Sequence, residues 1–308
     1  MRRIGTPGKK KIGRDFARFK YAYLMALPVL AFYLVFHYWP MYGAIIAFKD
    51  FTPARGILGS EWVGFEHFIA FFKSFYFVRV IKNTLTISLT QMLFGFPAPV
   101  LLALLINEIS SSRRKRLVQT ITYLPYFVSL VVVCGLIVEF SQTDGLFNWV
   151  RGLFGLSPIA LLNAPRFFVP VFVASGVWQN IGWNSIIYLS AMSAINPELY
   201  EAAIVDGAGR FRQALSITLP GIGPTIIVLL ILRVGQIMNV GFEKVLLLYN
   251  SAVMDVADVI STYVYRKGLL EFNWSFSSAV GLFNSCVNFI LLVLVNKFAR
   301  KITETSLW

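Results

Sequence analysis

Six long runs without Asp, Glu, Lys or Arg limit what this chain can fold into. They cover residues 21–48, 83–107, 117–138, 167–197, 213–232 and 272–296. A helix rises 1.5 Å per residue, so about 20 apolar residues cross a bilayer core of roughly 30 Å. Only 14% of the residues are charged, against about 25% in a typical soluble domain. The sequence therefore predicts an all-α, polytopic integral membrane protein with six transmembrane helices.

Lys and Arg are distributed unevenly over the segments that connect these runs. Residues 1–20, 108–116, 198–220 and 297–308 carry 17 of them, and residues 49–82, 139–166 and 243–278 carry 10. The positive-inside rule places the first set, with both termini, in the cytoplasm. The net charge of +13 is then an orientation signal with contact to anionic membrane lipid, and we expect no nucleic-acid partner. Residues 1–20 form a basic tail, and the long run after them predicts an uncleaved first helix rather than a signal peptide.

The largest predicted cytoplasmic loop, residues 198–220, is suited to two short helices. Asn196 can cap the first helix, and Pro197 fits its first position because the missing N–H costs nothing there. Residues at helical spacing give this helix a face of mainly small side chains, which lets another surface come close. Gly207 and Gly209 permit a sharp turn, and a second helix leads to Pro220. These features predict an exposed elbow joined to two membrane helices, although a plain connector would look much the same.

The segment EAAIVDGAGRFRQALSITLP, residues 201–220, resembles the EAA loop of permease subunits in binding-protein-dependent ABC importers. The flanking segments GWNSIIYLSAMSAINPELYEAA, NVGFEKVLLLYN and DVADVISTYVYRKGL are similar to sugar permeases of the maltose-importer kind. Within these, the chain most resembles the branch that imports oligosaccharides derived from polysaccharides. The resemblance covers nearly the whole chain, and it implies the type I ABC importer fold with one transmembrane domain over residues 21–308.

The resemblance also implies a mechanical role for the loop, as a coupling helix that docks in a groove of a cytoplasmic ATPase. The residues at the family's signature positions are Glu201, Ala202, Ala203, Asp206, Gly207, Ile217, Leu219 and Pro220. One position differs, because Ala214 stands where these permeases often have an aromatic residue, and Phe211 lies three residues earlier. The implied partners are a second, related permease in a heterodimer, two ATPase subunits and an extracellular substrate-binding lipoprotein.

The chain has no motif for chemistry of its own. It contains no G-x-x-x-x-G-K-[S/T] loop to hold phosphates, and no G-x-S-x-G, H-E-x-x-H or paired-carboxylate pattern for hydrolysis. Its two cysteines, Cys134 and Cys286, lie inside apolar runs without metal-ligand spacing. We therefore expect no catalytic residues, no metal and no cofactor in this chain, with ATP and Mg²⁺ bound by the partner ATPase.

Amide, aromatic and charged side chains within three of the runs are candidates for a sugar path, because sugars need hydrogen bonds and flat apolar surfaces. They are Trp178, Asn180, Asn184 and Tyr188 in the fourth run, Arg233, Gln236, Asn239 and Glu243 at helical spacing in and after the fifth, and Asn284 and Asn288 in the sixth. The alternative is structural, with tryptophans at the membrane interfaces and amides bridging helices.

Three other functions compete with oligosaccharide import. An ABC permease for a polyol or a glycerol-phosphate-type solute is the nearest. An ion-coupled secondary transporter would need inverted repeats and carboxylates within the membrane, and neither stands out. A membrane enzyme acting on lipid-linked glycans would need an acidic catalytic cluster, which the sequence does not offer.

Overall fold

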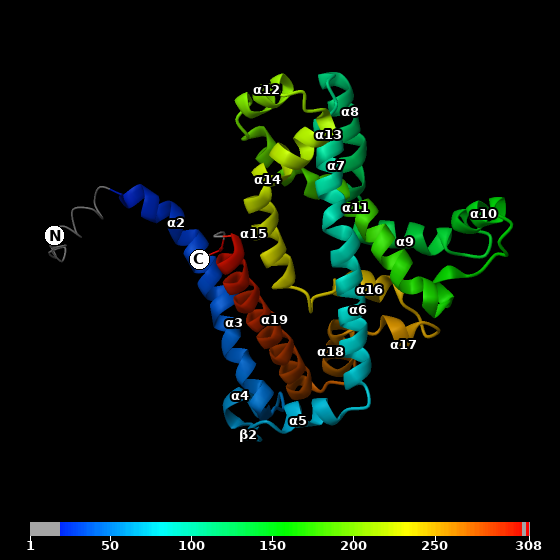
Figure 1. Cartoon of the computed structure of the whole chain (residues 1–308). Coiled ribbons are helices and arrows are strands. Elements are labelled where there is room, and N and C mark those ends of the chain that lie inside the picture. The colour runs from blue at the N-terminus through cyan, green and yellow to red at the C-terminus, as the bar shows by residue number, and fades with distance from the viewer. Residues whose placement is uncertain (1–18, 304–305, 308) are drawn as a thin grey trace.

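In the computed structural model, which describes residues 19–303 and 306–307, the long helices follow one another in six groups, here called passes (Figure 1). The predicted basic tail therefore lies almost entirely outside the described residues. The first three passes are α2 (Lys20–Tyr33) with η1 (Leu34–Tyr38), α3 (Trp39–Met41) and η2 (Tyr42–Phe48); α6 (Phe77–Gly95) with α7 (Pro97–Asn107); and α8 (Ser112–Tyr123) with η3 (Leu124–Phe127) and α9 (Leu130–Phe140). The last three are α11 (Pro165–Ser193); α13 (Arg210–Gln213) with η5 (Ala214–Thr218), α14 (Leu219–Gly221) and α15 (Gly223–Val234); and α19 (Trp274–Thr303).

Short elements connect the passes, and two groups of them mark the two ends of the molecule in Figure 1. The elbow end, at the top of Figure 1, holds α12 (Glu198–Val205) beside the start of α8. The opposite, sheet end holds β1 (Lys49–Asp50) and β2 (Glu61–Trp62), which pair antiparallel with Lys49 opposite Trp62. The remaining connecting elements are α4 (Gly56–Gly59), α5 (Glu66–Lys73), α10 (Leu146–Leu153), η4 (Leu161–Asn163), α16 (Phe242–Leu248), α17 (Met254–Ala257), α18 (Ile260–Tyr265) and η6 (Arg266–Leu270).

The passes agree with the six predicted runs in order, and length and composition support most of them as membrane spans. Three helical stretches are long and apolar enough to cross a membrane, namely Lys20–Phe48, Phe77–Asn107 and Trp274–Lys301. Two bent helix pairs raise the number to five. The remaining pass, α11, has 29 residues and carries the amides Gln179, Asn180 and Asn184 in its middle. The chain is thus a helical, multi-pass membrane protein, as predicted.

Two passes are bent, whereas the sequence predicted continuous spans there. Ser112–Phe127 and Leu130–Phe140 meet at 93°, and Arg210–Gly221 and Gly223–Val234 meet at 60°. At the first bend, the chain becomes extended at Val128 and Ser129, directly after a 3-10 turn that contains Pro125. At the second, Pro224 has no N–H to donate to the carbonyl of Pro220, so the helix cannot continue straight.

The helix α11 is the centre of the fold, because it packs against α6, α7 and α8. Close approach to α8 depends on Gly182: a Cβ there would overlap the carbonyl oxygen of Thr122. On its other flank, Phe168, Phe172 and Val173 belong to a buried cluster shared with α9 and α16. Nearer the elbow end, Tyr188 and Met192 pack with residues of α7 and with Ile222. These contacts place the second and third passes and the start of the fifth against α11.

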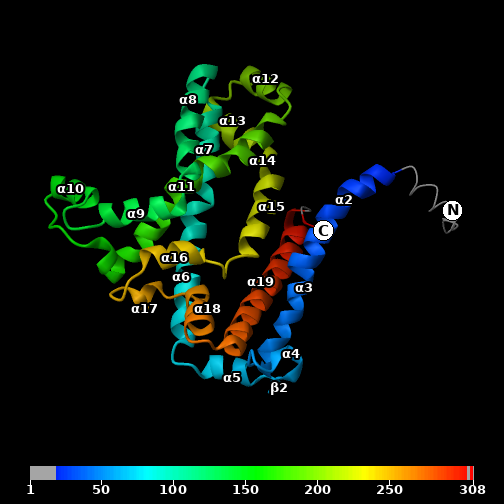
Figure 2. The ribbon, with the colours of Figure 1, turned by 180° about the vertical axis from the view of Figure 1, so that it is seen from behind.

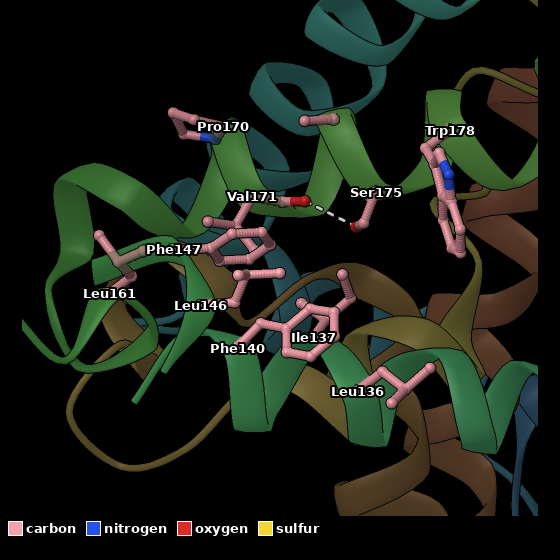
Figure 3. Close-up of a pocket in the computed structure, with 11 residues that line it drawn as sticks. Leu136, Ile137, Phe140, Leu146, Phe147, Leu161, Pro170, Val171, Ser175 and Trp178 are labelled. Carbon is pink, nitrogen blue, oxygen red and sulfur yellow. Dashed lines mark hydrogen bonds between the residues drawn. The ribbon is translucent and has the colours of Figure 1, made fainter. Parts of the chain in front are cut away.

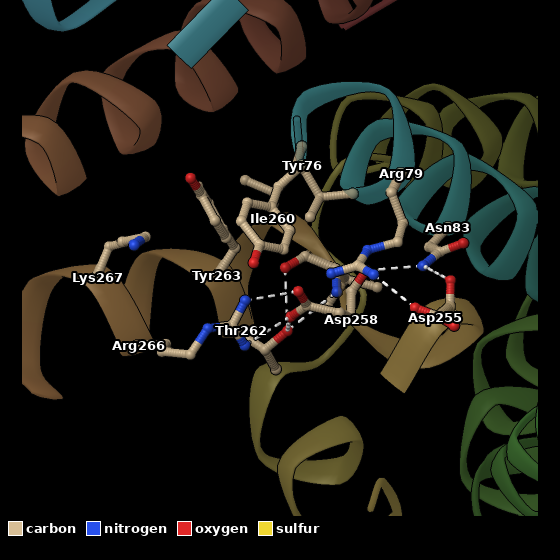
Figure 4. Close-up of polar contacts among 12 residues, drawn as sticks. Tyr76, Arg79, Asn83, Asp255, Asp258, Ile260, Thr262, Tyr263, Arg266 and Lys267 are labelled. Atoms are coloured by element: carbon tan, nitrogen blue, oxygen red, sulfur yellow. Dashed lines mark hydrogen bonds and ion pairs between the residues drawn. The ribbon is translucent and has the colours of Figure 1, made fainter. Parts of the chain in front are cut away.

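A buried polar network ties the connection between α15 and α19 to the start of α6 at the sheet end (Figure 4). Asp258, fully buried, receives hydrogen bonds from both guanidinium nitrogens of Arg266 at 2.7 and 3.2 Å and from Thr262 Oγ1 at 2.8 Å. The Asn83 side chain donates to the carbonyls of Asp255 and Asp258 at 2.9 and 3.0 Å. Since every partner lies within the chain, this network serves the fold and anchors α17 and α18 on α6.

The helix α2, which has 14 residues, buries none of them. Its N-terminal half diverges from the rest of the molecule in both views (Figures 1 and 2). Large apolar side chains such as Leu24, Met25 and Leu30 are exposed along it. The end of the same pass, η2, packs against α19 near the sheet end.

Candidate functional site

The elbow, residues 198–220, is built from local interactions that agree with the sequence prediction. Asn196 Oδ1 accepts a hydrogen bond from the backbone N–H of Glu198, the first residue of α12, at 3.1 Å, and Pro197 rather than Asn196 occupies the N-cap position. Gly207 adopts a left-handed conformation with φ of +73°, which non-glycine residues rarely adopt. The chain then turns through Gly209 into α13. Two short helices with a glycine turn between them are therefore confirmed.

The elbow is joined firmly to the membrane passes but leaves one surface open. The hydroxyls of Tyr200 and Thr218 lie 2.9 Å apart and connect α12 to the start of the fifth pass. The α12 helix buries none of its residues, and Val205 is 88% and Phe211 79% exposed. Large apolar side chains left open on a well-ordered helix are typical of an interaction surface.

The predicted coupling residues divide between this open surface and the attachment. Glu201, Ala202, Asp206 and Gly207 are exposed, and Ala203 is half-buried. Ile217 and Leu219 are half-buried, Leu219 packs on the cluster around Tyr188 and Ile222, and Pro220 is exposed. A movement of the first group would therefore pass directly to the second and into α15.

A half-polar cleft of about 380 Å³ lies between α6, α11 and α15, within the usual size range of ligand sites. Asn180, Asn184, Tyr188, Arg233 and Gln236, all proposed for the substrate path from the sequence, line it together. The structure therefore brings half of the ten candidates to one place. It also adds Gln91, which the sequence analysis missed because a lone amide in an apolar run gives no pattern.

The cleft combines hydrogen-bonding groups with one positive charge. Asn180 Nδ2 donates to the carbonyl of Gly176 at 2.9 Å, which fixes the amide and leaves its Oδ1 able to accept. Arg233 is half-buried in the last turn of α15 and lines the cleft. A smaller hollow beside it is lined by Arg233, Gln236 and Asn239 as well. Such a site can bind a polyhydroxylated solute, and its charge favours an anion.

The expected polar stripe from Arg233 to Glu243 on one continuous helix is wrong. The α15 helix ends at Val234, and Gly241 has a left-handed φ of +71° before α16 begins. Glu243 consequently lies exposed on a separate helix and lines neither hollow. Helical spacing could not show this break, because the residues between Gly235, which follows α15, and Gly241 are compatible with a helix.

Three amides near this break bridge helices. Asn284 Nδ2 donates to Asn239 Oδ1 at 3.0 Å, which joins α19 to the segment after α15. Asn288 is buried, and its Oδ1 accepts from the backbone N–H of Met238 at 3.1 Å. These contacts hold the segment after α15 against α19, and they thereby fix the position of the α15 side of the cleft.

Trp178 lies apart from the polar cleft, in an apolar pocket of about 600 Å³ between α9, α10 and α11 (Figure 3). Phe140, Phe147 and Pro170 are among the side chains that line it. The only hydrogen bond drawn there joins Ser175 Oγ to the carbonyl of Val171 within α11. An apolar pocket of this kind suits a hydrocarbon group rather than sugar hydroxyls, which would lose their hydrogen bonds there.

No group of three or more His, Cys, Asp or Glu side chains that could hold a metal occurs among residues 19–303 and 306–307. Cys134 is buried and Cys286 exposed, and neither forms a disulfide in that part of the chain. The polar side chains that line the cleft are amides, a tyrosine and an arginine, which can bind and orient a solute.

Comparison with known proteins identifies relatives over nearly the full length. Residues 95–304 match the family model described as "Binding-protein-dependent transport system inner membrane component". The polygalacturonan/rhamnogalacturonan transport system permease protein of Bacillus subtilis is 45% identical over 94% of this chain and 90% of its own length. The sn-glycerol-3-phosphate transport system permease protein of Yersinia pestis is 29% identical over 91% and 94% of the two chains.

A solved structure also matches closely. A chain in the crystal structure of a bacterial alginate ABC transporter, in complex with an alginate pentasaccharide-bound periplasmic protein, superposes with a TM-score of 0.88. It is 44% identical, and the match covers 96% of this chain and 99% of that one. The predicted type I ABC importer fold is therefore confirmed.

Proposed function

Because this chain belongs to the family of binding-protein-dependent transport system inner membrane components, we propose that it is the permease subunit of an ABC importer for an oligosaccharide. The observation that supports this most is the cleft, which offers amides, a tyrosine and an arginine along the helices that the elbow connects. The permeases of 44–45% identity belong to systems named for polygalacturonan, rhamnogalacturonan and alginate. A glycerol-phosphate-type substrate is less well supported, because the glycerol-phosphate permease is only 29% identical to this chain.

The elbow is the proposed contact with the ATPase subunits. Its exposed face on α12 offers small side chains at Ala202 and Ala203, next to exposed apolar residues. Small side chains allow a second surface to approach closely, and the apolar ones provide burial on docking. ATP and Mg²⁺ would be bound by two such subunits, and closing of the ATPases would move α12 and, through the Tyr200–Thr218 contact, the fifth pass.

A second, related permease would complete the path. One chain forms only one wall of the cleft, and α2 presents an apolar surface on which no residue is buried by the described part of the chain. A neighbouring permease that packs along α2 would cover this surface, and a facing set of helices would enclose the cleft. From the resemblance of the sequence to these permeases, we propose that the second permease is a different, related chain, so that the pair is a heterodimer.

The orientation follows from the elbow. If it meets cytoplasmic ATPases, both termini lie in the cytoplasm of a bacterial cell, and the basic segments contact anionic lipid there. The sheet end then faces outward, where a substrate-binding lipoprotein would deliver the oligosaccharide. The exposed aromatic side chains Trp62, Phe65 and Phe75 at that end provide surface for such a contact.

Uptake into proteoliposomes tests this function. The complete importer should accumulate a labelled oligosaccharide only with ATP at the elbow side, and ionophores that collapse Na⁺ and H⁺ gradients should have no effect. Uptake driven by an ion gradient without ATP would instead establish a secondary transporter and contradict the proposal.

A further inference from the structure

The positive charge of the cleft is not neutralised by any residue of the described chain. Fifteen residues line the cleft, and none of them is Asp or Glu. The Arg233 side chain forms none of the ion pairs or hydrogen bonds found between described residues. A cation held among membrane helices without a partner is unfavourable and marks functional positions.

A second cation lies directly behind the wall of the same cleft. Lys244 Nζ donates to the carbonyl of Phe172 at 2.8 Å and lies 4.7 Å from the centre of its ring. A Cβ on Gly176, which lines the cleft, would lie 3.0 Å from Lys244 Nζ and 3.7 Å from Gln91 Nε2. The ammonium group of Lys244 therefore lies next to the cleft, with Gly176 between them.

The two cations act on the same space. Lys244 is 8% exposed and has no carboxylate partner in the described chain. In a buried setting the field of each charge is weakly screened, so both raise the electrostatic potential inside the cleft. A neutral solute gains nothing from this potential, whereas a carboxylate is attracted by both groups.

We propose that the cleft binds the carboxylate of an acidic, uronate-containing oligosaccharide, and that Arg233 is the residue that selects it. This inference rests on the proposed function, because it specifies the substrate class of the same path. The planar guanidinium can donate two parallel hydrogen bonds to one carboxylate, which adds direction to charge. Asn180, Asn184 and Gln236 line the same space and provide donors and acceptors for the ring hydroxyls.

A competing explanation is that Arg233 pairs with an acidic residue of the second permease. In that case removal of its charge would weaken the association of the two permeases and would affect acidic and neutral sugars alike. The experiment therefore includes a measurement of assembly as well as a comparison of ligands that differ only in charge.

The test is equilibrium binding to the purified complex of permeases and ATPases, without the binding protein. The ligands are trigalacturonate and trimannuronate, each compared with its neutral methyl ester. We expect at least one acid to bind at least tenfold more tightly than its ester. Arg233→Gln should weaken binding of that acid at least tenfold and leave the ester unchanged, whereas Arg233→Lys, which keeps the charge but not the two parallel donors, should bind the acid with an affinity between those of Arg233→Gln and wild type.

Three outcomes would overturn the inference. They are equal binding of acid and ester by the wild type, equal loss of both ligands in Arg233→Gln, and loss of the second permease from the purified Arg233→Gln complex. ATP-dependent uptake of a neutral oligosaccharide combined with any of these would leave the proposed function standing. Absence of ATP-dependent uptake of every sugar would instead refute the proposed function and this inference with it.

Discussion

The elbow and the sheet-end network use polar residues in opposite ways. In the network, Asp258 is 0% exposed and its carboxylate is fully engaged by Arg266 and Thr262. In the elbow, Glu201 and Asp206 are exposed and form none of the ion pairs found in the described chain. In the network the charged groups pair with one another and stabilise the fold, whereas the exposed charges of the elbow remain available to another molecule. The cleft is intermediate, with charges that are sheltered but unpaired.

Removal of the buried Asp258 carboxylate should have the largest effect on stability and therefore tests the difference between the network and the elbow most strongly. Asp258→Ala should destabilise the protein by about 3–5 kcal/mol, because it leaves Arg266 partly buried without its partner. Asp255→Ala, three residues earlier, is the matched control: its side chain is 84% exposed, so its ion pair with Arg79 should contribute at most about 1 kcal/mol. Thermal unfolding in detergent measures both. Similar losses for the two variants would show that the network does not depend on burial.

The sheltered cation behind the cleft should give a pH-dependent stability. Burial lowers the pKa of Lys244 to about 8 from 10.5. Between these values the unfolded chain binds the proton and the folded chain does not, so folding stability should rise with pH across this window, by up to about 3 kcal/mol. Below pH 8 the cost of the buried charge is fully present.

The matched variant for this effect is Lys244→Met, which keeps the side-chain length and removes the titrating group. The difference in melting temperature between the variant and wild type should be largest below pH 8 and should shrink toward pH 10.5. A constant difference across that range would mean that Lys244 is solvated, which would place it with the exposed charges of the elbow.

Packing at the centre of the fold gives the next smaller effect. Gly182→Ala should cost about 1–3 kcal/mol, because the added methyl group meets the carbonyl oxygen of Thr122 and forces α8 and α11 apart. Gly135→Ala is the control, since a Cβ there meets nothing within 4 Å. Melting temperatures should fall for the first variant only. If both variants melted like wild type, α8 would not pack on α11 as described.

The sequence predicted the elbow well and the cleft only in part, for a physical reason. Asn196, Gly207 and Gly209 act on the residues next to them, so the turn could be derived locally. The cleft joins α6, α11 and α15, which are distant in sequence. Gln91 could not be recognised without that packing. Nor could the end of α15, because the hydropathy of residues 235–241 is compatible with a continued span.

The central claim is that the elbow passes motion from an ATPase into the membrane, and Ala202→Trp tests it most directly. Ala202 is exposed on α12, so the larger side chain should change the unfolding free energy by no more than about 0.5 kcal/mol. It should nevertheless prevent close docking, and ATP-driven uptake by the assembled importer should fall at least tenfold, whereas Ala202→Ser should transport normally. Wild-type uptake and retained ATPase subunits in the Ala202→Trp complex would contradict the claim.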